Sequence, residues 1–455
     1  MTEPSGSRRT EVRRIASLAW PVILGQVGLV AMGTADMLMV GHLGAEPLAA
    51  IGIANTWSFA ALIFGLGVCS GLDPFFSQAY GAGRLHEVGQ ALVRGGLLVT
   101  CLGFLLIGVH LAAGPGLTLL AQPAILIGDA SSYCTIIAYS VPPFLGFALI
   151  KQLLQGSGRM KPAMWVIALG NLANILANWV FIYGNLGFDA MGVPGAAAST
   201  VLVRWAMFTA LLALGSAEIR RVWPWGIDLG NTKALSHVAF TALPVGLQLG
   251  LEVWAFNAAT LMAGWLGSLS VAAHTAALNI ASLAFMVPLG LSAAATTRTG
   301  NLVGAGHPWA RAAWISLGLS TVAAATSATL FTLAPHSLAH LYNPDPEVIG
   351  LIALVLPIAA LFQGFDAGQV VSFGILRGLG DTRKPMIANV VGYWLVGLPA
   401  GYLLAFHGGM GLRGIWWGMT LSLAIVSGLL LARIGWHHYG LRRSSMPRIS
   451  PRSRR

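Results

Sequence analysis

Long apolar segments, separated by short polar connections, run through almost the whole chain. A helix needs about 20 apolar residues to cross a bilayer, and twelve segments here meet that length. The pattern therefore predicts an all-α integral membrane protein with twelve transmembrane helices. The expected segments are residues 15–38, 47–76, 90–113, 123–148, 162–183, 194–215, 239–266, 269–296, 311–334, 348–374, 386–406 and 412–436.

Composition strengthens this interpretation. The 455 residues are 56% hydrophobic and 9% charged, with a mean hydropathy of +0.74, whereas soluble domains carry about 25% charged residues. A soluble fold of this length could not bury so much apolar surface, so we expect the lipid bilayer to surround the protein. The chain has no phosphate-binding loop of the G-x-x-x-x-G-K type and no His or Cys at zinc spacing, so we do not expect an enzyme.

The basic residues are distributed unevenly along the chain. The formal net charge is +11, and 24 of the 26 Lys and Arg residues lie in the two tails or in alternate connections. The exceptions are Arg413, in an opposite connection, and Arg204, inside the sixth segment. The positive-inside rule then predicts that both termini lie in the cytoplasm and that the protein resides in the inner membrane of a cell. It also accounts for the net charge without a nucleic-acid partner.

The second half of the chain repeats features of the first half at an offset of 223 positions. The matched pairs are Pro21 with Pro244, Met39–Gly44 with Met262–Gly267, Gly81-Ala-Gly83 with Gly304-Ala-Gly306, and Lys161-Pro162 with Lys384-Pro385. Each half holds six predicted helices, and an even number gives both halves the same orientation, as in parallel transporter repeats. The predicted units are a tail (1–14), a first lobe (15–215), a linker (216–238), a second lobe (239–436) and a basic tail (437–455).

Three carboxylates lie inside predicted membrane segments: Asp36, Glu252 and Asp366. A charge at bilayer depth costs about 2.5–3.5 kcal/mol on insertion scales, and ion or proton pathways are a common reason to keep one there. The repeat places Ala259, Leu29 and Pro143 at the corresponding positions, so a packing requirement shared by both halves does not explain them. The alternative for Glu252 and Asp366 is a structural hydrogen bond to a neighbouring group, and for Asp36 it is a carboxylate at the membrane interface in contact with water. Asp73, near the end of the second segment, we interpret as structural.

Amide side chains form a second set of candidates. Asn171, Asn174 and Asn178 are spaced by three and four residues and so share one helix face. In a bilayer such a face must turn toward protein or water, which leaves a cavity lining and interhelical hydrogen bonding as alternatives. Asn257 and Asn279 are weaker candidates of the same kind.

Several stretches together resemble the multidrug and toxic compound extrusion (MATE) transporters, with the NorM-like branch the most similar. They cover both halves of the chain, from about residue 15 to residue 436. The stretches are Ala35–Gly44, Ser77–Arg84, Gly250–Phe256, Val287–Ala295, Gly300–Gly306 and Phe362–Asp366.

The resemblance implies two six-helix lobes around a central cavity and export of small organic cations against Na⁺ or H⁺. It assigns the coupling ion to Asp36, Glu252 and Asp366, with Na⁺ at the last two as the one metal ion expected. Asn174 and Asn178 resemble a polar patch that lines the first lobe's cavity in relatives. Animal and plant relatives often carry a second glutamate where this chain has Asn257.

The expected protein is therefore a monomeric secondary transporter that works by alternating access and needs no prosthetic cofactor. One alternative is a flippase for a lipid-linked saccharide, which should place several cationic side chains in its cavity to hold pyrophosphate. Arg204 is the one such residue that the sequence offers. A membrane enzyme would need clustered polar residues at one membrane face, and an ion channel is disfavoured by the two-fold repeat.

Overall fold

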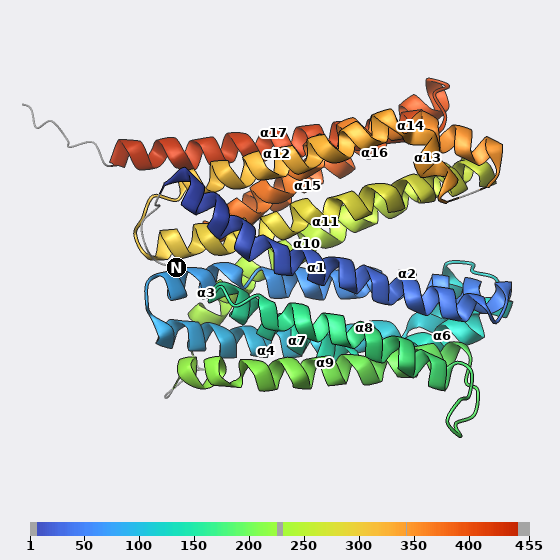
Figure 1. Cartoon of the computed structure of the whole chain (residues 1–455), viewed down its shortest axis with the longest axis horizontal. Coiled ribbons are helices and arrows are strands. Elements are labelled where there is room, and N and C mark those ends of the chain that lie inside the picture. Colours follow the sequence, from blue (N-terminus) through green and yellow to red (C-terminus); the bar gives the residue numbers. More distant parts are fainter. Residues whose placement is uncertain (1–6, 225–230, 343, 445–455) are drawn as a thin grey trace, which may run out of the picture.

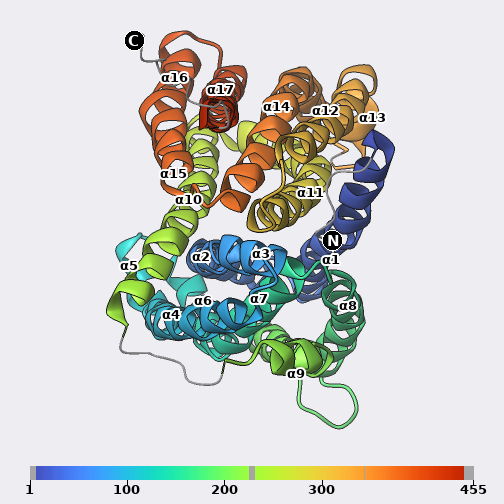
Figure 2. The ribbon, with the colours of Figure 1, turned by 90° about the vertical axis from the view of Figure 1, so that its left-hand side faces the viewer.

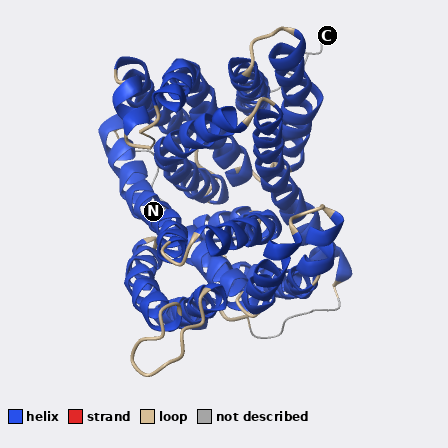
Figure 3. Ribbon diagram, turned by 90° about the vertical axis from the view of Figure 1, so that its right-hand side faces the viewer, coloured by secondary structure: helices blue, strands red, loops and turns tan. Residues whose placement is uncertain are grey.

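The computed structural model describes residues 7–224, 231–342 and 344–444, which form helices and loops without a β-strand among them (Figure 3). The helices of the first half are α1 (Arg8–Gly41), α2 (Ala45–Ser70), α3 (Asp73–Gly81), α4 (Leu85–Leu111), α5 (Ala113–Leu119), α6 (Ala124–Ala138), α7 (Val141–Gly156), α8 (Lys161–Phe181) and α9 (Val193–Val222). Those of the second half are α10 (Thr232–Trp265), α11 (Ser268–Gly304), α12 (Ala310–Leu333), α13 (Pro335–His340), α14 (Pro346–Gly378), α15 (Arg383–Asn389), η1 (Val390–Gly397), α16 (Leu398–Tyr402), η2 (Leu403–His407) and α17 (Leu412–Ser444).

Twelve membrane spans are present when one bent pair of helices is counted as a single span. Eleven helical stretches among the described residues are long and apolar enough to cross a bilayer by themselves. The twelfth span is α6 with α7, which meet at an angle of 50°. Pro142 and Pro143 stand at the start of α7, where a proline's missing N–H and fixed φ interrupt a continuing helix. The predicted all-helical membrane fold is confirmed.

The helices form two lobes that correspond to the two halves of the chain (Figure 1). We call α1–α9 the N-lobe and α10–α17 the C-lobe. Figure 2 shows α1 on one flank and α10 on the other, each extending from its own lobe toward the opposite one. Accordingly α1 packs on α11, and α10 packs on α2. These two pairings are equivalent under the repeat, because α1 corresponds to α10 and α2 to α11.

The start of α1 and several basic connections gather at one end of the bundle, on the left in Figure 1. We call it the basic end. It contains the start of α1 and the connections at residues 82–84, 157–160, 305–309 and 379–382. The lobes touch at this end, and the ribbons diverge toward the opposite end (Figure 1).

Backbone contacts between the repeats hold the lobes together at the basic end. A Cβ atom at Gly81 would lie 2.1 Å from the carbonyl oxygen of Asn301, and one at Gly304 would lie 1.9 Å from that of Gln78. Residues 78 and 81 correspond to 301 and 304 at the repeat offset, so the two contacts are the same contact seen from each lobe. Ser77 meets Gly300, its own counterpart, which places the pseudo-two-fold axis between them.

A second pair of glycines explains the rest of the repeated Gly-Ala-Gly motif. Gly83 has φ of +71° and Gly306 has φ of +70°, a left-handed conformation that glycine adopts without a steric penalty. The first glycine of each motif permits the contact between lobes, and the second ends the helix in a tight turn. The repeat read from the sequence is therefore also a repeat in backbone geometry.

Helices extend further than the predicted units. The expected tail 1–14 includes the first turns of α1, for which Ser7 is the N-cap and accepts a hydrogen bond from the Thr10 amide. The predicted linker 216–238 is shorter than expected, since α9 continues to Val222 and α10 begins at Thr232; residues 225–230 lie outside the described residues. The tail 437–455 is helical as far as Ser444, and the remainder lies outside the described residues. Apolar patterning misses these turns because they are polar.

Gly304→Ala should destabilise the protein, since its new methyl group would overlap the Gln78 carbonyl. Overpacking of this kind costs about 1–3 kcal/mol, and we expect a lower midpoint in thermal unfolding of the protein in detergent. Gly318→Ala in α12 is the control, because a Cβ there would meet nothing within 4 Å. Equal midpoints for the two variants would contradict the proposed backbone contact.

Candidate functional site

Glu252 of α10 lies within a set of polar side chains from α14, α15 and η1. Gln369 donates a hydrogen bond from Nε2 to Oε1 of Glu252 at 3.0 Å. The hydroxyl of Tyr393 donates to the same oxygen at 3.4 Å, and Asn389 Nδ2 donates to Oε2 at 3.5 Å. Tyr393 also donates to Gln369 Oε1 at 3.1 Å. The carboxylate is thus held by three helices of the C-lobe.

Local helix geometry brings Asn389 and Tyr393 to the same carboxylate. The span Arg383–His407 changes from α-helical to π-helical turns at Val390, and such turns are frequent at functional sites. Asn389 is anchored further by donating to the backbone oxygen of Gln248 at 3.1 Å. Its own Oδ1 atom is buried and accepts no hydrogen bond from the described residues, so an oxygen ligand beside Glu252 remains available.

Asp366 is the second carboxylate of this site. It precedes Gln369 by three residues in α14 and therefore projects from the same helix face. Its side chain is buried, and it lies close enough to Glu252 for their negative charges to repel each other. No described residue donates a hydrogen bond to Asp366. Two carboxylates in such surroundings can be neutralised by binding a proton or a cation.

Asp36 occupies a separate site in the N-lobe, where α1 meets α8 and α9. Asn178 donates to Oδ1 of Asp36 at 2.6 Å, and Thr200 donates to Oδ2 at 3.2 Å. Asn178 also donates to Asn174 Oδ1 at 3.4 Å and accepts a hydrogen bond from the Ser199 hydroxyl. Asn174 and Asn178 are buried, so this amide face takes part in interhelical hydrogen bonding.

Other polar residues of the membrane segments lie apart from these carboxylates. Asn171 bonds the backbone oxygen of Ile167 in its own helix at 2.9 Å. Asn279 likewise bonds Thr275 at 2.9 Å, and its side chain is exposed, as is that of Asn257. The structure does not join Asn257 and Asn279 to the carboxylate sites, and their role as cavity lining stays a prediction.

Arg204 of α9 lies at the break between α6 and α7. Its Nη1 donates to the Ser140 hydroxyl at 2.7 Å, and its guanidinium stands 4.9 Å from the ring centre of Phe144. It interacts electrostatically with Asp36 without forming a direct ion pair. Its position one helical turn from Thr200 puts a fixed positive charge inside the N-lobe.

The sequence predicted the three carboxylates and the nearby amides Asn174 and Asn178, but not the other polar residues that contact the carboxylates. Gln369, Asn389 and Tyr393 were not singled out, and neither was Thr200. Gln369 carried a usable signal, because it is a polar residue three positions from Asp366 in an apolar segment. Asn389 and Tyr393 carried none, since their contact with Glu252 depends on the packing of distant helices.

Comparison with known proteins identifies the family. The family model MatE matches residues 21–180 and again residues 244–403, so the two matches are offset by the same 223 positions as the repeat. The chain belongs to the MatE family. It is 37% identical over 446 residues to "Probable multidrug resistance protein NorM" of Mesorhizobium japonicum, covering 94% of this chain and 95% of that protein. It is 32% identical to "Multidrug resistance protein MdtK" of Yersinia pestis, with the same coverage.

Solved structures agree in fold. The eukaryotic MATE transporter AtDTX14 superposes with a TM-score of 0.86 at 22% identity, covering 97% of this chain and 100% of that one. A multidrug resistance MATE transporter of the MOP superfamily in an outward-facing conformation gives a TM-score of 0.84 at 20% identity, again covering 97% and 100%. This MATE protein is a multi-pass membrane transporter, as the sequence predicted.

Asn178→Leu should destabilise the N-lobe, because it removes the 2.6 Å hydrogen bond to Oδ1 of the buried Asp36 carboxylate. An unsatisfied buried acceptor costs about 1–3 kcal/mol, which thermal unfolding in detergent would record as a lower midpoint. Asn171→Leu on the same helix is the matched control, since Asn171 bonds its own helix only. Equal effects of the two substitutions would contradict a special role for the Asn178 hydrogen bond.

Proposed function

We propose that this MATE transporter exports small organic cations, including drugs, in exchange for Na⁺ or H⁺ by alternating access. The observation that carries the proposal is the pair of neighbouring carboxylates in the C-lobe, Glu252 and Asp366. Their mutual repulsion favours uptake of one positive charge, and a carboxylate inside a membrane segment is retained chiefly for such a role. The multidrug names of the NorM and MdtK relatives support the same class of substrate.

The chemistry of the C-lobe site suits either coupling ion. Carboxylate, amide and hydroxyl oxygens surround Glu252, and hard cations prefer oxygen ligands. A proton could equally neutralise Glu252 or Asp366, since that relieves the repulsion between their two like charges. In the proposed cycle, binding of the ion accompanies drug release on the outer side, and loss of the ion to the cytoplasm prepares the next drug to bind.

The orientation in the membrane belongs to the same proposal. We place the basic end in the cytoplasm and the protein in the inner membrane, as the positive-inside rule requires. The lobes then touch on the cytoplasmic side and diverge toward the outside, so the described conformation corresponds to an outward-facing state. We expect the protein to act as a monomer, because each chain carries both lobes and both carboxylate sites.

Glu252→Gln and Asp366→Asn should each abolish coupling, because a neutral side chain gains no charge when the ion binds. We expect ethidium efflux from proteoliposomes under an imposed Na⁺ or pH gradient to fall to about the rate measured without a gradient, since the site no longer gains a charge from the ion. Glu347→Gln is the control, since Glu347 lies exposed in the first turn of the same helix as Asp366. Full gradient-driven efflux in both site variants would overturn the proposal, and the effective gradient in the unmodified protein identifies the ion.

Asp36→Asn tests the N-lobe site separately. The amide keeps the size of the side chain but removes the charge that Asn178 and Thr200 stabilise, and we expect slower efflux under the same gradient. A variant with unchanged efflux and unchanged ion dependence would assign coupling to the C-lobe alone. Comparison with Asn171→Leu separates this effect from a general weakening of the N-lobe.

A further inference from the structure

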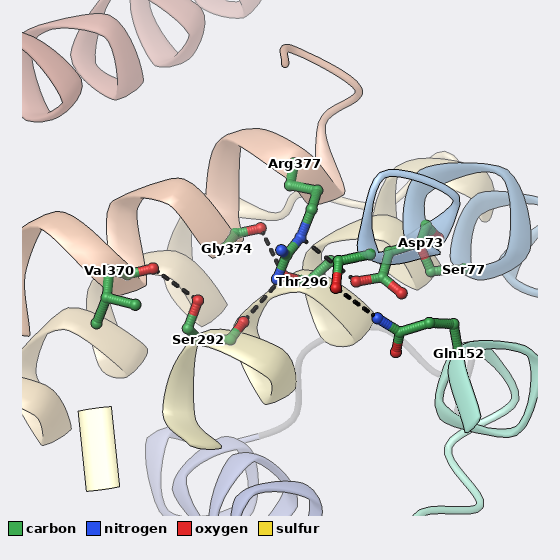
Figure 4. Close-up of polar contacts among 9 residues, drawn as sticks. Asp73, Ser77, Gln152, Ser292, Thr296, Val370, Gly374 and Arg377 are labelled. Carbon is green, nitrogen blue, oxygen red and sulfur yellow. Dashed lines mark hydrogen bonds and ion pairs between the residues drawn. The ribbon is translucent and has the colours of Figure 1, made fainter. Parts of the chain in front are cut away.

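Asp73 of the N-lobe and Arg377 of the C-lobe form an ion pair across the interface between the lobes (Figure 4). Arg377 Nε lies 3.3 Å from Asp73 Oδ2. Asp73 is 3% exposed, and neither of its carboxylate oxygens accepts a hydrogen bond from the described residues. A buried carboxylate with one long ionic contact and no hydrogen bond is weakly held for its depth.

The C-lobe presents Arg377 from a rigid support. Gly374 and Gly378 of α14 lie against the backbone of α11, where added Cβ atoms would come within 2.4 Å of the Ser292 carbonyl and 2.6 Å of the Thr296 carbonyl. Thr296 Oγ1 bonds the Gly374 carbonyl at 2.9 Å and accepts from Arg377 Nη2 at 3.1 Å. Arg377 is therefore positioned by its own lobe and would keep that position if the N-lobe moved away.

The repeat reveals an asymmetry at this point. Thr296 is the counterpart of Asp73 at the offset of 223 positions, so Arg377 contacts two equivalent positions, one in each lobe. One position is a neutral threonine in its own lobe, and the other is a carboxylate across the interface. Helix packing shared by the two halves does not require that carboxylate.

Asp73 also has a cation in its own lobe. Lys151 of α7 interacts electrostatically with Asp73 and is repelled by Arg377, but it forms no ion pair within 4.0 Å among the described residues. Gln152, the next residue in α7, bonds Ser70 at 2.9 Å and links α7 to the helix that precedes Asp73. Lys151 therefore supplies a positive charge near the carboxylate that moves with the N-lobe, without an ion pair to it in this conformation.

A second ion pair between the lobes has a different character. Arg298 binds Glu11 through Nε at 2.6 Å and Nη2 at 2.9 Å, and both side chains are almost fully buried. The counterpart of Arg298 at the repeat offset is Phe75, which packs edge-on against His237 with ring centres 5.5 Å apart. The two contacts lie on the two flanks, where α1 and α10 extend between the lobes. The buried Arg298–Glu11 pair is costly to break, whereas the Phe75–His237 contact is a weaker ring interaction with an exposed histidine.

We propose that Asp73 exchanges partners during transport: it pairs with Arg377 while the lobes touch at the basic end and with Lys151 when they separate there. The Asp73–Arg377 pair and the backbone contacts at the axis open together, while the flanking contacts Arg298–Glu11 and Phe75–His237 stay closed as hinges. Arg377 and Lys151 are positioning residues that set the balance between the two states. The inference rests on the proposed alternating-access cycle and adds the residues that control it.

Spin labels at His86 and Lys384 test the exchange. Both residues are exposed at the basic end, one in each lobe, and labelled cysteines there report the separation of the lobes by pulsed electron paramagnetic resonance after replacement of Cys69, Cys101 and Cys134. Arg377→Gln should increase the population with the longer distance about tenfold, the change that 1.4 kcal/mol produces. Lys151→Gln should decrease it, because the separated state loses its ion pair.

The same two substitutions are then made in a protein that also carries Asp73→Asn. In it, Arg377→Gln and Lys151→Gln should no longer shift the distance distribution in opposite directions, since the carboxylate that they compete for is gone. Arg433→Gln is the matched control: it removes an ion pair with Asp381 at 2.7 Å at the same end but within the C-lobe, and should leave the distribution unchanged. Arg377→Lys, which keeps the charge, should restore most of the wild-type distribution.

The inference is overturned if Arg377→Gln and Lys151→Gln shift the distances in the same direction, if their effects persist with Asp73→Asn, or if the distances do not change at all. The readout needs no drug and no efflux. Failure of ethidium transport would therefore contradict the proposed function and leave the partner exchange standing. Spin-label distances that do not shift as expected would contradict the partner exchange and leave the proposed function standing.

Discussion

The backbone contact between α3 and α11 at the pseudo-two-fold axis is the constraint on which the arrangement of the lobes depends. Gly81 lies on Asn301 and Gly304 lies on Gln78, at distances that exclude any side chain. Contacts this close let two helix ends meet without lipid or side chains between them, as small residues do in membrane helix pairs. Because the contact lies at the basic end, the lobes are joined there and are free to diverge at the other end.

Residues that both halves share build the helix framework, whereas the carboxylates of the candidate sites occur in one half only. Pro21 and Pro244, Gly83 and Gly306, and the paired glycines at the axis are shared by both halves. The carboxylates are not: Asp36, Glu252, Asp73 and Asp366 correspond to Ala259, Leu29, Thr296 and Pro143. Two lobes with the same backbone but different charges can respond differently to one ion, as the proposed coupled transport requires.

The two carboxylate sites differ in how their charge is satisfied. Asp36 receives hydrogen bonds from Asn178 and Thr200 on two helices, and Glu252 receives them from Gln369, Asn389 and Tyr393. In the C-lobe, Glu252 shares its surroundings with Asp366, which has a negative charge nearby and no donor among the described residues. Under the proposed function, this feature of Asp366 favours the C-lobe as the place where charge is taken up and released. The ion pair of Arg377 lies three turns further along the helix that carries Asp366.

The sequence by itself determined the membrane class, the number of spans, the repeat and the intramembrane carboxylates, because each of these depends on local composition or on spacing along one helix. Length and hydropathy fix a span, and the offset between glycines reveals the repeat without any structure. Only the tertiary structure decided that Tyr393 and Asn389 reach Glu252, that Asn178 bonds Asp36, and that Asp73, which we had interpreted as a local structural residue, meets Arg377 across the lobes. Those pairs lie more than a hundred residues apart in the chain, and side-chain contacts at such separations follow from helix packing, which no periodicity within a segment encodes.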